Sequence, residues 1–223
     1  MSKIFKFFLI CCYVFIPVYA FATDCSKYKY DVDINVNNIT KYEPVIQSSK
    51  ENMIGKMGEI LYQLSYSLKI FIIQIPVKDG YCVSLRSVDI DINVPEFLIN
   101  IDKRLKPDTC AYDIVLKHEQ DHMNVNKDVI NSNMDRIKQA VINAVDSIKP
   151  VFISKIEDSG DIQINIQNEI ENYKDVKDIK KKIKSEMNNA NEEIDTRGDS
   201  FEMWKCEDFY NEMKKYSDKI RID

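Results

Sequence analysis

The alternation of hydrophobic and polar residues predicts strands in the first half of the chain. Apolar and polar residues alternate over residues 30–36, which is typical of a half-buried strand. A run rich in β-branched residues over 70–75 precedes a turn signal at residues 79–80, and apolar residues resume over 83–94, which predicts a hairpin. The apolar parity changes between Leu85 and Val88, so we expect a β-bulge there.

Apolar residues at helical spacing predict two helices before residue 150. Ser48 and Glu51 form a capping box, and apolar positions then recur every three or four residues as far as Leu68. The second helix should begin near Pro107 and continue without a breaker to Pro150, a length of about 40 residues.

The pattern changes after residue 150, where we expect a C-terminal appendage that is mainly helical. A short strand is predicted at 162–166, and helices near 170–193 and 201–217. We therefore divide the mature chain into a domain over residues 23–150 and an appendage over 151–223. The order of elements predicts an α+β fold, with a mixed or antiparallel sheet packed on the long second helix.

The first 22 residues have the three parts of a secretory signal peptide. Lys3 and Lys6 precede an apolar run over residues 7–19, and the small residues Ala20 and Ala22 mark the cleavage site. We expect residues 1–22 to be removed and the mature chain to be secreted or periplasmic, without a stable membrane anchor.

The charge balance disfavours a nucleic-acid-binding protein. The chain has 36 acidic and 31 basic residues, a net charge of -5, and its like charges form no long block. The hydrophobic content of 44% is sufficient for a packed core, which disfavours general disorder.

The predicted mature chain contains four cysteines, and an even number in an exported protein indicates two disulfides. Three pairings of Cys25, Cys82, Cys110 and Cys206 are possible. We favour Cys82 with Cys110 and Cys25 with Cys206, because the first pair would join a strand and a helix that we expect to lie side by side.

Both histidines of the chain lie in one pentapeptide, His118-Glu119-Gln120-Asp121-His122, which has the HExxH pattern of zinc metallopeptidases. Residues four apart project from neighbouring turns of one helix face, so both imidazoles could bind one Zn²⁺. Glu119 would point about a quarter-turn away and could serve as the general base for a metal-activated water.

The third protein ligand is left open by the sequence. The chain has no third histidine, so we expect a carboxylate rather than a tyrosine or a thiolate. Asp128, Asp146 and a carboxylate from the C-terminal helices, such as Glu202, are the candidates.

The segment over residues 82–90, the pair Val94-Pro95 and the HExxH motif resemble a family of exported bacterial proteins of uncharacterised function that are presumed to be zinc-dependent proteases. The resemblance extends over residues 28–148. It implies a small zincin-like fold, with His118 and His122 as zinc ligands and Glu119 as the catalytic base.

The leading hypothesis is therefore an exported zinc metallopeptidase that acts on a peptide or protein substrate. The predicted strand over residues 88–94, adjacent to the active-site helix, would bind the substrate as an added strand. The alternative is a non-enzymatic exported module that binds zinc or another protein. A latent enzyme, with residues 151–223 covering the cleft, is a third possibility.

Overall fold

The computed structural model describes residues 23–50, 53, 56–196, 205–207 and 209–210. The predicted signal peptide at 1–22 and most of the helix predicted at 201–217 lie outside the described residues. The described chain has an α+β fold, and both of its sheets are mixed.

In the described part of the chain, seven strands form two sheets. They are β1 (Asp33–Asn38), β2 (Val45–Ser48), β3 (Gly58–Tyr62), β4 (Ser65–Val77), β5 (Gly80–Asn93), β6 (Phe97–Ile101) and β7 (Val151–Ile153). The larger sheet has the order β1-β5-β4, with β7 also paired to β5, and the smaller has the order β2-β6-β3. In each sheet one pair is parallel, β1 with β5 and β2 with β6.

The described residues also form four α-helices: α1 (Cys110–Ser132), α2 (Met134–Ser147), α3 (Ser159–Asn172) and α4 (Lys174–Thr196). Short 3₁₀ turns occur at Ser26–Tyr28 and Ile156–Asp158. No helix among the described residues is long and apolar enough to cross a membrane.

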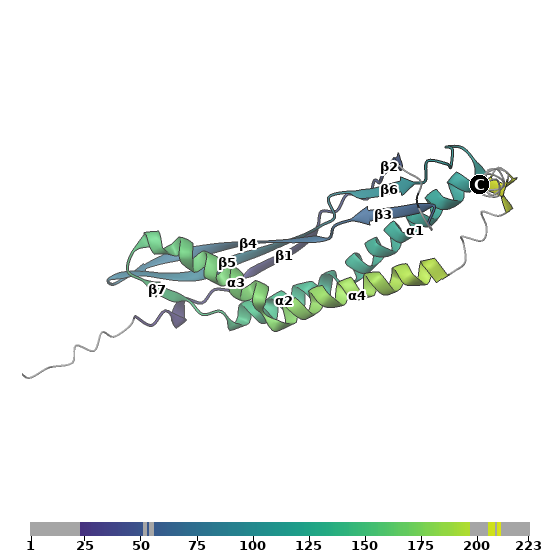
Figure 1. Cartoon of the computed structure of the whole chain (residues 1–223). Coiled ribbons are helices and arrows are strands. Elements are labelled where there is room, and N and C mark those ends of the chain that lie inside the picture. The colour runs from purple at the N-terminus through teal and green to yellow at the C-terminus, as the bar shows by residue number, and fades with distance from the viewer. Residues whose placement is uncertain (1–22, 51–52, 54–55, 197–204, 208, 211–223) are drawn as a thin grey trace, which may run out of the picture.

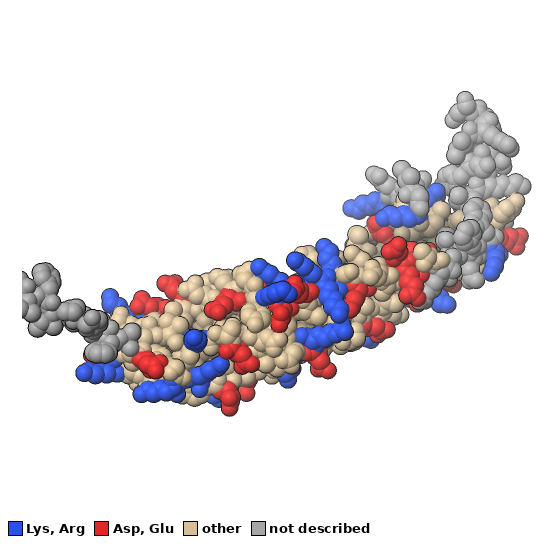
Figure 2. All heavy atoms as spheres, turned by 90° about the horizontal axis from the view of Figure 1, so that it is seen from below, with Lys and Arg blue, Asp and Glu red and all other residues tan. Residues whose placement is uncertain are grey.

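The molecule is elongated, with the two sheets end to end and a layer of helices along one side (Figure 1). The chain passes along this layer through α1 and α2 and returns through α4, which is antiparallel to both. A space-filling view from below shows acidic and basic side chains interspersed over this face (Figure 2).

Two buried clusters hold the layers together. The larger contains residues of β4, β5, α2, α3 and α4, so residues from both sides of Pro150 share it. The smaller lies at the other end, where Ile99 and Ile101 of β6 pack with Val115 of α1 and with Cys206 and Phe209.

The predicted hairpin and bulge are confirmed. β4 and β5 are antiparallel, and Asp79 in the turn between them has a positive φ of 71°. The register shifts between Phe71 and Ile72, whose partners are Ser87 and Leu85, so Arg86 is the extra residue of the bulge.

The helix predicted from Ser48 to Leu68 is wrong, because the described part of this segment contains the end of β2, all of β3 and the start of β4. Its apolar positions fit helical spacing, but Leu64, Tyr66, Leu68 and Ile70 also alternate with polar residues. Their side chains pack on the larger core, so burial selects the period of two.

The strand predicted at 162–166 is also wrong, because these residues belong to α3. Ile166 and Ile170 are buried and lie on one helix face with the partly buried Ile162, whereas Ile164 is 59% exposed. The isoleucines therefore follow a helical period.

The continuous helix predicted over residues 107–150 is interrupted at Asn133, which separates α1 from α2. The Asn133 side chain is buried and donates to the carbonyl of Val129 and to the Glu186 carboxylate, while its oxygen accepts from Arg136. The bond to Glu186 connects the break between α1 and α2 to α4.

The favoured disulfide pairing is wrong. The bonds join Cys25 to Cys82 and Cys110 to Cys206. Cys82 lies near the start of β5, opposite Phe152 of β7, whereas Cys110 begins α1 at the opposite end of the molecule (Figure 1). The prediction failed because Cys82 and Cys110 lie at opposite ends of the strand and helix layers and are too far apart to form a bond.

Candidate metal centre

Helix α1 presents the HExxH motif toward the smaller sheet. Thr109 caps the helix, its side chain accepting from the backbone N–H of Tyr112. His118 and His122 lie on neighbouring turns, and their rings pack edge to face with centroids 4.7 Å apart. The two imidazoles therefore converge on one point beside the helix.

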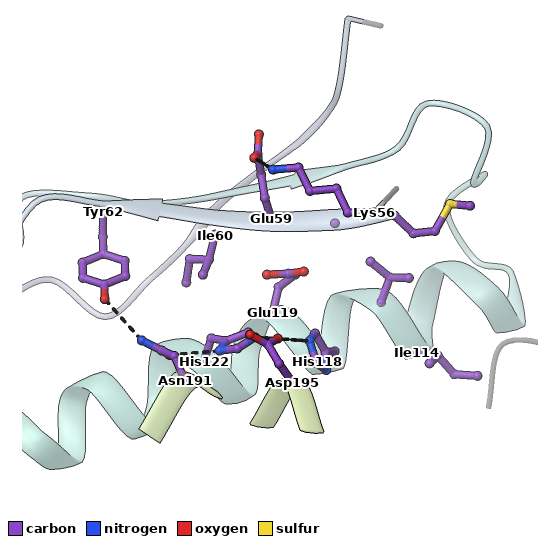
Figure 3. Close-up of a pocket in the computed structure, with 13 residues that line it drawn as sticks. Lys56, Glu59, Ile60, Tyr62, Ile114, His118, Glu119, His122, Asn191 and Asp195 are labelled. Atoms are coloured by element: carbon purple, nitrogen blue, oxygen red, sulfur yellow. Dashed lines mark hydrogen bonds and ion pairs between the residues drawn. The ribbon is translucent and has the colours of Figure 1, made fainter. Parts of the chain in front are cut away.

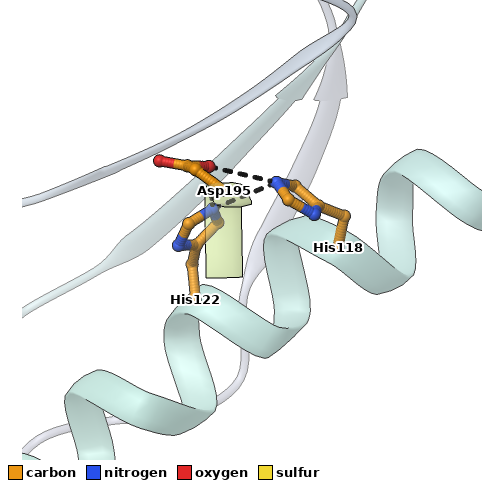
Figure 4. A group of neighbouring side chains, drawn as sticks. All are labelled: His118, His122 and Asp195. Carbon is orange, nitrogen blue, oxygen red and sulfur yellow. Dashed lines mark hydrogen bonds and ion pairs between the residues drawn. The ribbon is translucent and has the colours of Figure 1, made fainter. Parts of the chain in front are cut away.

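Helix α4 brings a carboxylate to the same point. Asp195 Oδ1 lies 3.1 Å from His122 Nε2 and 3.4 Å from His118 Nε2, and the two Nε2 atoms are 3.2 Å apart (Figure 4). His122 is buried, whereas the side chain of Asp195 is 63% exposed. The three atoms form a small triangle that is open on the Asp195 side.

This triangle fits a tetrahedral zinc ion. Zinc binds histidine nitrogen and carboxylate oxygen at about 2.0–2.2 Å, so two ligands of one tetrahedron lie about 3.3–3.5 Å apart. The observed separations of 3.1, 3.2 and 3.4 Å are close to that range. Two imidazoles and one carboxylate would supply three of four positions and would leave one for a water or a substrate.

The hydrogen bonds around His122 also favour a cation at this point. His122 Nδ1 lies 2.9 Å from Asn191 Oδ1, which can only accept, so Nδ1 carries a proton. In the neutral imidazole, Nε2 then presents a lone pair to the Asp195 oxygen. Two lone pairs at this distance repel each other unless a proton or a metal ion lies between them.

Asn191 belongs to a network that orients His122. Its amide nitrogen donates to Asn126 Oδ1 at 3.1 Å and to the Tyr62 hydroxyl at 3.4 Å. Tyr62 comes from β3 and Asn126 from α1, so the network joins three elements. Such outer partners fix the ring orientation and tautomer of a metal-binding histidine.

Glu119 points from α1 toward β3 (Figure 3) and is only 5% exposed. Burial raises the pKa of its carboxyl to about 7, although the nearby His122 acts in the opposite direction. A carboxyl with this pKa can both accept and donate a proton near neutral pH.

Gly58 permits this close approach of β3 to α1. A Cβ atom at this position would lie 2.6 Å from Glu119 Oε1 and 2.6 Å from Val115 Cγ1. Any side chain at residue 58 would therefore displace the Glu119 carboxylate or separate the strand from the helix.

A cleft of about 510 Å³ lies between β3 and α1, with α4 at its side. His118, Glu119 and His122 line it together with Asn191 and Asp195. Ile60 and Tyr62 extend into it from β3 (Figure 3), so the candidate metal ligands and Glu119 share one accessible space.

The structure brings the three motif residues together with a carboxylate of a C-terminal helix, one of the kinds of third ligand considered from sequence, but not with Asp128 or Asp146. Asp128 and Asp146 are exposed and lie outside the cluster, and Glu202 is outside the described residues. The carboxylate that joins the histidines is Asp195, which sequence reasoning did not single out. Asn191 and Asp195 share the four-residue spacing of the histidines, and this was the only sequence signal for them.

The strand that lines the cleft is not the one that the sequence predicted to receive the substrate. Residues 88–93 belong to β5, which is paired on one side with β1 and on the other with β4, so it cannot add a strand there. β3 is at the edge of its sheet and lines the cleft.

The chain matches no protein-family model, no curated protein and no solved structure.

Proposed function

We propose that this chain is an exported, zincin-like zinc metallopeptidase. The observation that carries the proposal is the convergence of His118 Nε2, His122 Nε2 and Asp195 Oδ1 within 3.4 Å of one another, beside a cleft that contains Glu119. HExxH sequences arise by chance, but a carboxylate from a distant helix that completes the ligand set is an independent observation.

In this proposal His118, His122 and Asp195 hold Zn²⁺, and Asn191 keeps the Nε2 lone pair of His122 directed at it. A bound zinc ion would act as a Lewis acid toward a water and a substrate carbonyl. Glu119 would accept the proton of the attacking water and deliver it to the nitrogen of the leaving amine. Burial beneath Gly58 holds its carboxylate facing the cleft.

The free edge of β3 would align the substrate. An extended peptide could pair with this strand as an added β-strand, which would place a peptide bond over Glu119. The proposed substrate is therefore a peptide or an unfolded protein segment.

Export is supported by the two disulfides, because disulfides persist mainly in oxidising compartments. The proposed location is the periplasm or the extracellular space.

Metal content tests the first half of the proposal. The purified, disulfide-bonded chain should contain about one zinc per molecule, and His118→Ala should lose it. Asp195→Asn should weaken zinc binding at least ten-fold, whereas Asp128→Asn, an exposed change on the same helix as the histidines, should have no effect. Wild-type protein that binds no zinc would refute the proposal.

Cleavage of a denatured protein or a peptide library tests the second half. Glu119→Gln should retain the zinc and the fold but lower the cleavage rate by about 10² or more. Zinc binding without cleavage by the wild-type chain would instead support the non-enzymatic zinc-binding module.

A further inference from the structure

A second hollow, of about 390 Å³, adjoins the metal-centre cleft. Tyr62 lines both. One wall is the junction of β3 and β4, and the other is the part of α4 that precedes Asn191 and Asp195. Its lining is Tyr62, Gln63, Leu64, Tyr66, Lys180, Lys184, Met187 and Asn188.

The charged residues that line this hollow are both lysines, whereas Glu59, Glu119 and Asp195 are among the residues lining the cleft. Lys180 and Lys184 lie one helical turn apart, an arrangement of like charges that slightly destabilises a helix. Two of the other four lysines of α4 form ion pairs, Lys174 with Asp178 and Lys182 with Glu186.

Among the described residues, neither Lys180 nor Lys184 has such a partner. In the described part of the chain no carboxylate lies within ion-pair distance of either ammonium, and the Lys180 ammonium lies 5.2 Å from the centre of the Tyr66 ring. Two cations thus lie beside a hollow without a counter-ion from the described residues.

The distance from each lysine to Asp195 corresponds to a few residues of an extended peptide. Along α4, Lys184 and Lys180 precede Asp195 by about 16 and 22 Å at 1.5 Å per residue. An extended peptide advances about 3.3 Å per residue, so it covers these lengths in about five and seven residues.

We propose that this hollow, which we call the lysine subsite, binds an acidic side chain of an extended peptide substrate about five to seven residues from the cleaved bond. The inference rests on the proposed peptidase function and adds a substrate class to it. Charge complementarity and the position of the hollow next to the cleft, with Tyr62 lining both, carry it.

Binding to an inactive variant tests the lysine subsite separately from catalysis. The full chain with Glu119→Gln and bound zinc is titrated with fluorescent peptides of neutral sequence that carry one Glu, moved along the peptide, or Gln at the same position. Glu at positions about five to seven residues from the centre, on one side, should tighten binding about three- to ten-fold relative to Gln. The gain should fall with salt.

Variants in which a lysine is replaced by glutamine test whether the two lysines cause the tighter binding of Glu peptides. Lys180→Gln and Lys184→Gln should each reduce the preference for Glu, and together abolish it. Lys181→Gln is the matched control, because Lys181 is an exposed residue of the same helix that does not line the hollow. Equal affinity for Glu and Gln peptides at every position, or an equal loss in Lys181→Gln, would overturn the inference.

Cleavage assays with the wild-type chain distinguish a failure of the peptidase proposal from a failure of the lysine subsite. The acidic peptide should be cleaved with a lower KM and an unchanged kcat, since the contact is distant from the reacting atoms. If no peptide is cleaved but the Glu preference in binding persists, the peptidase proposal fails and the lysine subsite stands. If peptides are cleaved without a Glu preference, only the lysine subsite fails.

Discussion

At the residue scale, Gly58 determines how closely β3 can approach the candidate catalytic base. In Gly58→Ala the added methyl would overlap both Glu119 and Val115 at 2.6 Å. Because Val115 cannot turn away as the end of Glu119 can, we expect a loss of about 1–3 kcal/mol in the free energy of unfolding. The displaced carboxylate should lower the cleavage rate at least about ten-fold while the zinc content is unchanged. Urea unfolding and initial cleavage rates measure the two effects.

Gly160→Ala is the matched control for Gly58→Ala. No heavy atom lies within 4 Å of a Cβ at Gly160 in α3. This change should stabilise the protein by about 0.5–1 kcal/mol and leave cleavage unaltered. Wild-type stability and activity in Gly58→Ala would show that β3 and α1 are not held in close contact.

A second residue-scale prediction concerns Asp102, whose carboxylate is fully buried after β6. Burial acts to raise its pKa, but Arg104 and the backbone N–H groups of Arg104 and Met53 outweigh it, so its pKa lies below the ordinary 3.8. Because the folded-state pKa is lowered, the stabilisation is present above about pH 4 and is lost as the pH falls through the folded-state value. We expect Asp102→Asn to cost about 2–4 kcal/mol at pH 7.

The pH dependence separates this charge effect from a packing effect. Urea unfolding at about pH 7 and pH 3 should show a larger difference between wild type and Asp102→Asn at the higher pH. An equal difference at both values would mean that the charge of Asp102 does not contribute. The residue also anchors the cleft wall, because its backbone N–H donates to the Met57 carbonyl just before β3.

Residue types and local spacing were sufficient to place His118, Glu119 and His122 in one predicted site, because an HExxH motif is contained within two turns of a helix. Asp195 could not be predicted in the same way. It is separated from His122 by 73 residues, and only the packing of α4 against α1 brings the two together. Gly58 likewise acquires its importance from contact between a strand and a helix that are distant in sequence.

At the element scale, the isoleucines of α3 distinguish a helix from the strand that the sequence predicted. Ile170 is 1% exposed and Ile164 is 59% exposed. We expect Ile170→Ala to cost about 2–5 kcal/mol, whereas Ile164→Ala should stay within about 0.5 kcal/mol of wild type. Chemical unfolding of the two variants, which carry the same substitution, measures the difference. Comparable losses at both positions would contradict the helical assignment.

The same ambiguity of period explains which elements the sequence predicted correctly. The hairpin of β4 and β5 was predicted because β-branched residues and an Asp-Gly turn agree with each other. Over residues 57–68 the apolar positions fit both periods, and only contact with the core selects the strand. Local pattern therefore predicts an element when its signals agree, and tertiary burial decides the remainder.

At the scale of the whole molecule, the candidate metal centre depends on the register of α4 against α1 and α2. Polar contacts between facing side chains fix that register. Asn143 donates to Asp175, Asn133 donates to Glu186 and His122 bonds Asn191. These contacts are spaced along the antiparallel helices, so a shift of one turn would remove Asp195 from the histidines together with the others.

The disulfide Cys110–Cys206 should hold the end of α4 at the candidate metal centre. Cys110 begins the helix that carries the histidines, and Cys206 follows Asp195 in the chain. Without the cross-link, fraying at the end of α4 would withdraw Asp195 from the cluster. We expect the variant Cys110→Ser with Cys206→Ser to bind zinc at least about ten-fold more weakly, as measured by competition with a chromophoric chelator.

The pair Cys25–Cys82 provides a control of nearly equal thermodynamic weight at the other end of the molecule. Its sequence separation of 57 and the 96 of Cys110–Cys206 correspond to about 4–5 kcal/mol each in the chain-entropy model. Both double-serine variants should therefore lose similar stability, but only the loss of Cys110–Cys206 should lower the affinity for zinc. An equal fall in affinity in both variants would attribute the effect to global destabilisation, and unchanged affinity in both would show that packing alone holds Asp195 in place.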